Sequence, residues 1–170
     1  MITLRRLGIA TALALTATAA PSIAAGAATT AVSGTFVFDA GGTCPGPPPG
    51  YEDFIDYPVI VSGDLEGCWY TDVEEARHLG SPSGLYFEAG REVFVGEISG
   101  RAGTFSTTYR YEGKWDPDFP TGTEIWGRCQ HLIVPGSGTG GLRDVTGHIV
   151  RTDIATDGTV ALYRGFVRRT

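Results

Sequence analysis

The sequence contains no asparagine and few basic residues for its length. Without asparagine there is no N-glycosylation sequon. The 13 Lys and Arg are outnumbered by 19 Asp and Glu. The resulting negative net charge repels nucleic acid and anionic lipid. One basic cluster, Arg164, Arg168 and Arg169, is explained by a solvated strand end at least as well as by an interaction tail. We therefore expect no nucleic-acid partner.

The chain also lacks an apolar run long enough to span a bilayer. The apolar run Leu7–Ala20 has 14 residues and ends before a proline, so we expect no membrane span. Arg5 and Arg6 precede this run, and Ala25-Gly26-Ala27 supplies small residues after it. That order predicts an export signal over residues 1–27 and a secreted protein that begins at Ala28. Which export route is used stays open.

Residues 28–170 have a length that suits one domain with a core of its own. They keep 11 basic and all 19 acidic residues, a net charge of −8. Residues 40–53 hold four Pro and four Gly, which exclude a helix and break strand pairing, so we expect an irregular connection there.

Almost everything after Tyr57 is typical of short β-strands, because the segments are rich in β-branched and aromatic residues and end at Gly or Pro. A helix over residues 72–79, with Asp72 and Glu75 at capping-box spacing, competes with an extended strand end, which we favour. Turns are expected at Gly63-Asp64, Ala89-Gly90, Gly100 with Gly103, and Asp157-Gly158. The expected strands are 33–39, 57–61, 64–73, 84–88, 92–98, 103–113, 124–134, 147–155 and 159–168.

Many short antiparallel strands without helices must protect their edges by closing or stacking. We predict an all-β fold, a closed antiparallel β-barrel of about eight strands, with a β-sandwich as the alternative. Alternation gives two segments one apolar face each: Phe105, Thr107, Tyr109 and Tyr111 in the first, and Ile125, Cys129, His131 and Ile133 in the second. Residues 159–167 are apolar on both faces, which indicates cover by a loop or by a second subunit, so a homo-oligomer is possible.

Three cysteines in an exported chain indicate one disulfide and one remaining thiol. Cys68 and Cys129 both fall in expected strands, whereas Cys44 lies in the Pro- and Gly-rich connection. We predict a Cys68–Cys129 bridge and a reactive Cys44. One tension is that alternation places Cys68 opposite the apolar face of its strand and Cys129 on the apolar face of its own; a bulge near Gly67 would reconcile them.

His131 and His148 are the one pair that suggests a site. Each shares a face with apolar neighbours, and pairing of their strands would make the two imidazoles diagonal neighbours beside Tyr109. Such a pair could bind a metal or move protons. The alternative is two hydrogen-bonded histidines in a mixed core.

Other chemical motifs fail on inspection. Gly136–Gly141 matches G-x-G-x-x-G, but a turn and a strand follow it where a nucleotide site needs a helix. The acidic pair Asp153 and Asp157 lacks the ligands of a calcium loop, and Ser137 lacks the nucleophile-elbow pattern. The acidic residues Glu66, Glu88, Glu92, Glu97 and Glu124 are spread over different strands, and nothing in the sequence shows which converge.

The stretch Gly136–Gly147, followed by a strand, a turn and Tyr163-Arg164-Gly165, resembles the Gly-rich hairpin of the allene oxide cyclase-like barrels; dirigent proteins carry a similar one. Gly138, Gly140, Leu142 and Gly147 hold the matching positions. Residues 67–70 and 126–131 also resemble exported bacterial members of that class without an assigned role. The resemblance implies a barrel that holds a small, mostly apolar molecule without cofactor or metal. The family's catalytic residues have no recognisable match in this chain.

Three functions are therefore considered. The first is an exported barrel that binds a small apolar molecule in its interior, with Phe105, Tyr109, Tyr111, His131 and His148 as candidate pocket residues. The second is a cofactor-independent cyclase or isomerase whose acid–base groups are His131, His148 or an interior Glu. The third is a structural or interaction protein with a filled barrel. A cavity of roughly 300 Å³ or more would separate the first two from the third.

Overall fold

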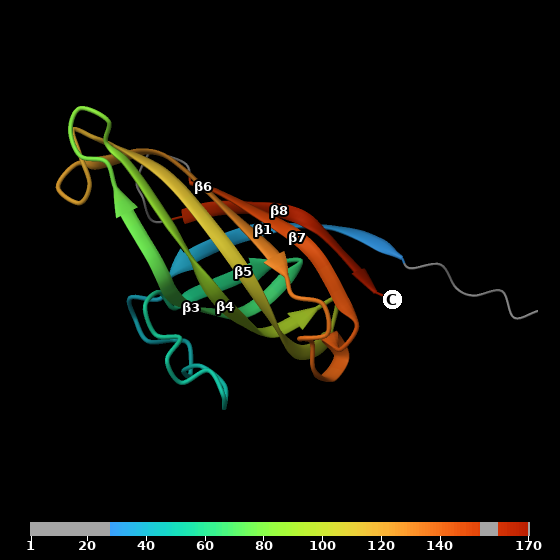
Figure 1. Ribbon diagram of the computed structural model, residues 1–170. Coiled ribbons are helices and arrows are strands. Elements are labelled where there is room, and N and C mark those ends of the chain that lie inside the picture. The colour runs from blue at the N-terminus through green and yellow to red at the C-terminus, as the bar shows by residue number, and fades with distance from the viewer. Residues whose placement is uncertain (1–27, 154–159, 170) are drawn as a thin grey trace, which may run out of the picture.

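The chain forms a closed barrel of eight antiparallel strands in a computed structural model that describes residues 28–153 and 160–169 (Figure 1). Each strand pairs with the next along the sequence, and the last pairs with the first to close the sheet. Closure removes every exposed edge, so the predicted barrel is confirmed over the sandwich. The export signal at 1–27 and the Asp157-Gly158 turn lie outside the described residues. The elements are β1 (Thr29–Phe38), β2 (Val59–Gly63), β3 (Leu65–His78), β4 (Leu85–Ile98), β5 (Arg101–Asp116), β6 (Thr123–Ile133), a 3₁₀ turn η1 (Gly140–Leu142), β7 (Val145–Asp153) and β8 (Val160–Arg169).

One long strand, β4, replaces the two strands expected at 84–88 and 92–98, so the predicted turn at Ala89-Gly90 is wrong. Gly90 lies within the strand, where a Cβ atom would stand 2.1 Å from the carbonyl oxygen of Asp72 and 3.0 Å from the ring of Tyr109. Glycine therefore marks a close approach of neighbouring chain here, and not a reversal. The segment 72–79 is extended, as favoured, because β3 runs on to His78 past a bulge between Val73 and Glu75.

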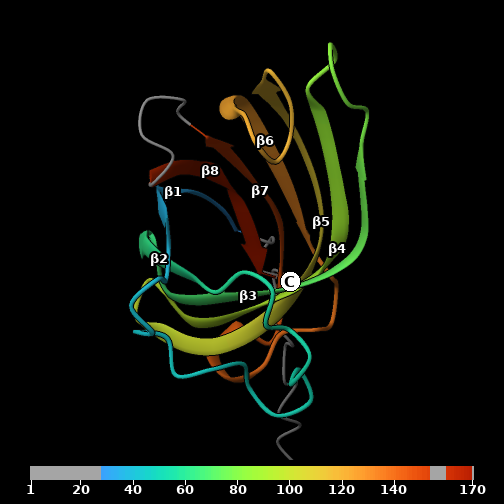
Figure 2. The same cartoon turned by 90° about the vertical axis from the view of Figure 1, so that its left-hand side faces the viewer.

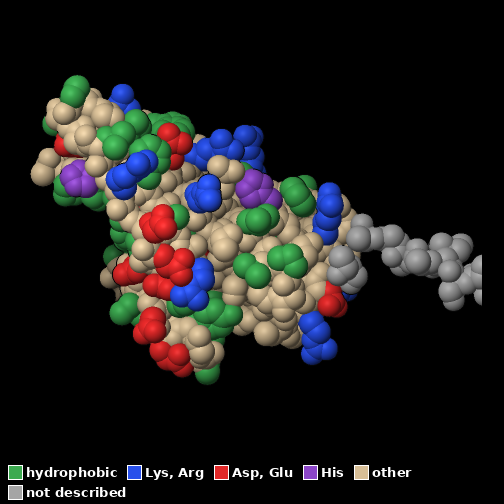
Figure 3. Space-filling view, in the orientation of Figure 1, with side chains coloured by type: hydrophobic (Ala, Val, Ile, Leu, Met, Phe, Trp, Pro, Cys, Tyr) green, Lys and Arg blue, Asp and Glu red, His purple; other side chains and the backbone are tan. Residues whose placement is uncertain are grey.

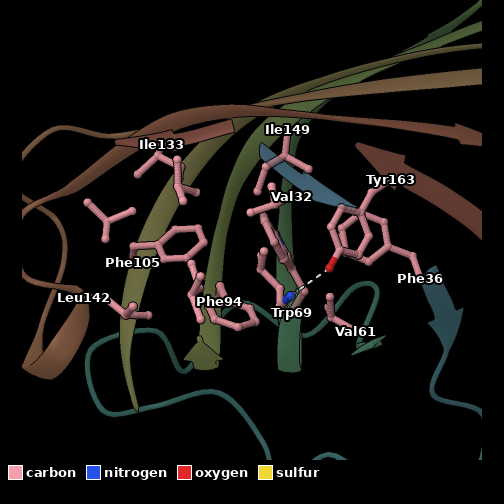
Figure 4. Packing of buried hydrophobic residues seen from close by; sticks show 14 of the residues in the cluster. Val32, Phe36, Val61, Trp69, Phe94, Phe105, Ile133, Leu142, Ile149 and Tyr163 are labelled. Carbon is pink, nitrogen blue, oxygen red and sulfur yellow. Dashed lines mark hydrogen bonds between the residues drawn. The ribbon is translucent and has the colours of Figure 1, made fainter. Parts of the chain in front are cut away.

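The two ends of the barrel differ. The tips at 79–84 and 117–122 lie at one end, which we call the tip end and which faces the viewer in Figure 2. The other end carries both termini of the described chain and η1. Interior side chains fill that second end, with Leu142 of η1 packed under Phe94 and Phe105 (Figure 4). The Leu65 amide donates to the Tyr163 hydroxyl across this core at 2.8 Å.

The connection between β1 and β2 covers the outside of the barrel wall. Phe54 from this connection packs against Tyr70 and Val93 on the outer face of β3 and β4. Asp39 fixes its first turn by accepting the backbone N–H groups of Thr43 and Cys44 at 2.8 and 2.7 Å. These backbone donors lower the pKa of the Asp39 carboxyl.

The disulfide joins Cys44 to Cys68, so the predicted Cys68–Cys129 bridge is wrong, and so is the prediction of a reactive Cys44. Cys68 faces outward beneath the β1–β2 connection, whereas Cys129 is buried on the interior face of β6. The barrel wall therefore separates the sulfurs of Cys68 and Cys129. Alternation in the sequence placed Cys68 on the polar face of its strand and Cys129 on the apolar face of its own, and this placement is correct. No bulge near Gly67 brings Cys68 to the interior.

The outer face of β8 alternates exposed apolar residues with Arg164 and Arg168. Leu162 and Phe166 are 47% and 36% exposed, and Leu132 of β6 is 57% exposed. We call these three residues the outer patch. Among the described residues the Arg168 guanidinium lies over the Phe166 ring at 5.2 Å from its centre. The expected covering loop is absent from the described part of the chain, and cover by a second copy stays a prediction.

On the face in Figure 3 the acidic side chains gather mostly toward the lower left, while Lys and Arg lie mostly along the upper edge and at the right, without forming one continuous basic surface. Within residues 28–153 and 160–169 there is no helix long and apolar enough to cross a membrane. In the same residues no three His, Cys, Asp or Glu side chains are grouped so that they could hold a metal ion.

Candidate functional site

An interior cavity of about 210 Å³ lies toward the tip end of the barrel. Phe36, Trp69 and His131 are buried at its floor, while Phe38 and Tyr57 are partly exposed at its rim. Seven of the eight strands and the β1–β2 and β5–β6 connections contribute to the lining. The lining residues are Phe36, Phe38, Tyr57, Val59, Trp69, Thr71, Tyr86, Glu88, Glu92, Tyr109, Tyr111, Trp115, Phe119, Glu124, Cys129, His131 and Arg151.

A buried carboxylate–imidazole pair lies at the floor. Glu92 Oε2 accepts the Thr107 hydroxyl at 2.6 Å and lies 2.7 Å from His131 Nδ1. The side chains of Glu92 and His131 are only 5% and 4% exposed. If Nδ1 of a neutral His131 donates its proton to the Glu92 carboxylate, Nε2 carries no proton and can accept a hydrogen bond. Nε2 has no hydrogen-bond partner among the described residues, and neither does the nearby Trp69 Nε1.

A second carboxylate lies farther toward the tip end, where Glu88 accepts two phenols. Tyr109 donates to Oε1 at 2.6 Å and Tyr86 to Oε2 at 2.7 Å. Burial, and then the hydrogen bond to Glu88, raise the pKa of both phenols. Both tyrosines therefore remain protonated donors at neutral pH and hold the Glu88 carboxylate between them.

Glu124 is the third carboxylate, and it accepts the Tyr111 hydroxyl at 2.8 Å. A register shift brings it inside: Lys114 pairs with Trp126 but Trp115 pairs with Glu124, which leaves Ile125 as the extra residue. The bulge reverses the alternation of β6 at this point. Ile125 is 46% exposed, so its predicted place on the apolar face with Cys129 is wrong.

The interior row above the floor runs across four strands. Glu88 pairs with Tyr111, Tyr111 with Cys129, and Cys129 with Arg151. The Arg151 guanidinium lies 5.8 Å from the centre of the Tyr111 ring. This row places one carboxylate, one phenol, one thiol and one guanidinium around the same cavity.

His148 does not belong to the site, so the expectation that the two imidazoles share a face is wrong. His148 pairs with Leu132, which is exposed, whereas His131 pairs with Ile149, which is buried. The two histidines lie on neighbouring strands, but their side chains point to opposite faces of the sheet, because side chains alternate along a strand. The expectation placed His148 inside the barrel because Val150 and Ile154, at alternate positions along the same segment, are apolar. Val150, however, faces the outside of β7, as His148 does.

Three predicted pocket residues, Tyr109, Tyr111 and His131, line the cavity. Phe105 lies instead in the filled core, with its ring centre 4.9 Å from that of Phe94. Sequence reasoning did not single out Glu88, Glu92 or Glu124 above the other acidic residues. A continuous β4 would have indicated the first two, because Tyr86, Glu88, Gly90, Glu92 and Phe94 share one face when the strand is read without a turn.

Comparison with known proteins adds no family to this geometry. No protein-family model matches the chain, and no curated protein is significantly similar to it.

Proposed function

We propose that this barrel binds a small, mostly apolar molecule in its interior cavity. The observation that carries this proposal is the hollow tip end: the same barrel is packed solid at its other end, so the space is not a property of small barrels in general. A filled structural barrel would need no such space.

The size of the cavity restricts the ligand. About 210 Å³ falls short of the roughly 300 Å³ expected of a ligand-binding barrel, which is the size of the smallest drug-sized pockets, so the proposal rests on a smaller ligand. The cavity exceeds the roughly 150 Å³ of an engineered apolar cavity that holds benzene. The space therefore fits a molecule of one ring with a short substituent. The aromatic walls supply contact area, and the hydrogen-bonding groups at the floor and around Glu88 would fix its orientation.

The three tryptophans supply a direct test. Trp69 and Trp115 line the cavity, while Trp126 is 41% exposed on the outer face. We expect benzyl alcohol to shift the ¹⁹F NMR signals of 5-fluorotryptophan at positions 69 and 115, with the signal of position 126 unchanged. A saturable shift of the Trp126 signal alone would refute interior binding.

A pair of substitutions controls for unspecific effects. Thr71→Phe places a ring in the cavity and should abolish the shifts, because Thr71 lines it. Thr108→Phe adds the same ring on the exposed outer face of β5 and should leave the shifts intact.

We also propose that the protein is exported. The basic, apolar and small-residue order of residues 1–27 supports this, although that segment lies outside the described residues. The Cys44–Cys68 disulfide agrees with an oxidising compartment.

A second candidate function is proton transfer on the bound molecule, as in a cofactor-independent isomerase or cyclase of the allene oxide cyclase type. The buried Glu92–His131 pair, with Nε2 unpartnered among the described residues, favours it. A ligand recovered with the protein should then exchange carbon-bound hydrogen in D₂O, and His131→Gln should abolish the exchange. Binding without exchange by the unaltered protein would contradict this candidate and leave the binding function in place.

A further inference from the structure

We propose that the ligand of the cavity is a small organic cation, an amine or a quaternary ammonium compound with one ring or a group of that size. This inference rests on the proposed binding function and deepens it. The net charge of the lining and its aromatic walls both point to a cation.

The lining carries a net negative charge. It holds three carboxylates, those of Glu88, Glu92 and Glu124, and one guanidinium, that of Arg151. The sum is −2 with His131 neutral and −1 with His131 protonated, so its sign does not depend on the imidazole. Glu88 and Glu92 are 9% and 4% exposed, and charges that are removed from water act more strongly on a ligand than surface charges do.

Aromatic rings stand beside these carboxylates toward the tip end. Tyr86 stacks on Phe119 with ring centres 4.1 Å apart, and Trp115 lies edge-on to both at 5.7 and 5.0 Å. The faces of such rings attract organic cations, and Trp and Tyr do so most strongly. The Arg151 guanidinium lies 5.8 Å from the centre of the Tyr111 ring, so the lining already includes one contact between a cation and an aromatic ring.

A neutral or anionic occupant is disfavoured by the same groups. An apolar molecule brings no charge to offset the lining carboxylates, of which Glu88 and Glu92 are already largely removed from water. An anion would face three carboxylates with a single guanidinium to balance them. An ammonium group instead compensates the carboxylates, and His131 Nε2, buried without a partner among the described residues, can accept an N–H from a primary amine that reaches the floor.

The test compares three one-ring compounds of similar size at neutral pH: benzylamine as the cation, benzyl alcohol as the neutral compound and benzoate as the anion. The readout is the ¹⁹F signals of Trp69 and Trp115. We expect benzylamine to bind at least tenfold more tightly than benzyl alcohol, and benzoate to produce no shift. Equal or tighter binding of benzyl alcohol or benzoate would overturn the cation inference while supporting the pocket. If none of the three compounds shifts the ¹⁹F signals of Trp69 and Trp115, interior binding itself is refuted.

Charge-neutralising variants localise the effect. Glu88→Gln keeps the shape of the side chain and should weaken benzylamine about tenfold, while the affinity for benzyl alcohol changes less than twofold. Glu124→Gln should also weaken the binding of benzylamine, and it replaces Glu88→Gln in the test if that variant does not fold. Glu112→Gln removes the same charge from the exposed face of β5 and should change neither affinity more than twofold. Equal losses for Glu112→Gln and the cavity variants would show that the net charge of the protein, and not the cavity, selects the cation.

Discussion

Replacing Glu92 with alanine should lower the free energy of unfolding by about 2–6 kcal/mol, because two buried groups lose their hydrogen-bond acceptor and each such loss costs about 1–3 kcal/mol. The Glu92 carboxylate is the acceptor for the Thr107 hydroxyl and lies 2.7 Å from His131 Nδ1. Both groups are buried, so neither can recover a partner from bulk water when the carboxylate is gone. Urea-induced unfolding measures the loss.

Glu112→Ala is the matched control for that substitution. Glu112 is exposed on the outer face of the next strand, β5, so its loss should change the free energy of unfolding by no more than about 0.5 kcal/mol. A loss below about 1 kcal/mol for Glu92→Ala would contradict the buried pair. It would mean that water reaches the floor of the cavity and solvates the groups left behind.

Removing the disulfide should be the other large effect. The bridge spans a sequence separation of 24 residues, and the chain-entropy model assigns a loop of that length about 3.5 kcal/mol. We expect the double variant Cys44→Ala, Cys68→Ala to be less stable than the unaltered protein by about this amount. Reductant should destabilise the unaltered protein similarly and leave the double variant unchanged.

Peptide mapping under non-reducing conditions separates the two possible pairings. The structure predicts a disulfide-linked peptide that contains Cys44 and Cys68, and Cys129→Ser should preserve it. A linked peptide containing Cys129, or a loss of stability on adding reductant to the double variant, would contradict the observed pairing.

The fold was predictable from the sequence because its main signal is local. Alternation along 103–111 placed Thr107, Tyr109 and Tyr111 on one face, and all three face the interior. Eight strands followed from segment length and turn residues, apart from the break at Gly90. The predicted break was wrong because the sequence alone does not distinguish a glycine inside a strand, where a neighbouring chain comes close, from a glycine in a turn.

The site was less predictable because it depends on which strands are neighbours and on where alternation is interrupted. Glu124 enters the cavity only through the bulge at Ile125, and a one-residue shift of this kind leaves no clear mark in the sequence. His148 failed for a related reason: apolar residues occupy both faces of β7 and β8, so hydropathy did not identify the interior one. Val150, which shares the outer face of β7 with His148, is the source of that ambiguity.

The outer patch is the competing place for a small aromatic molecule to bind, so the location of binding is the decisive question. Isotope-filtered NOE measurements between benzylamine and the protein answer it most directly. Binding in the cavity predicts NOEs from the benzylamine ring to the side chains of Phe36, Tyr109 and Trp115, and none to the outer patch. NOEs to Leu132, Leu162 or Phe166, without any to the cavity residues, would contradict the account.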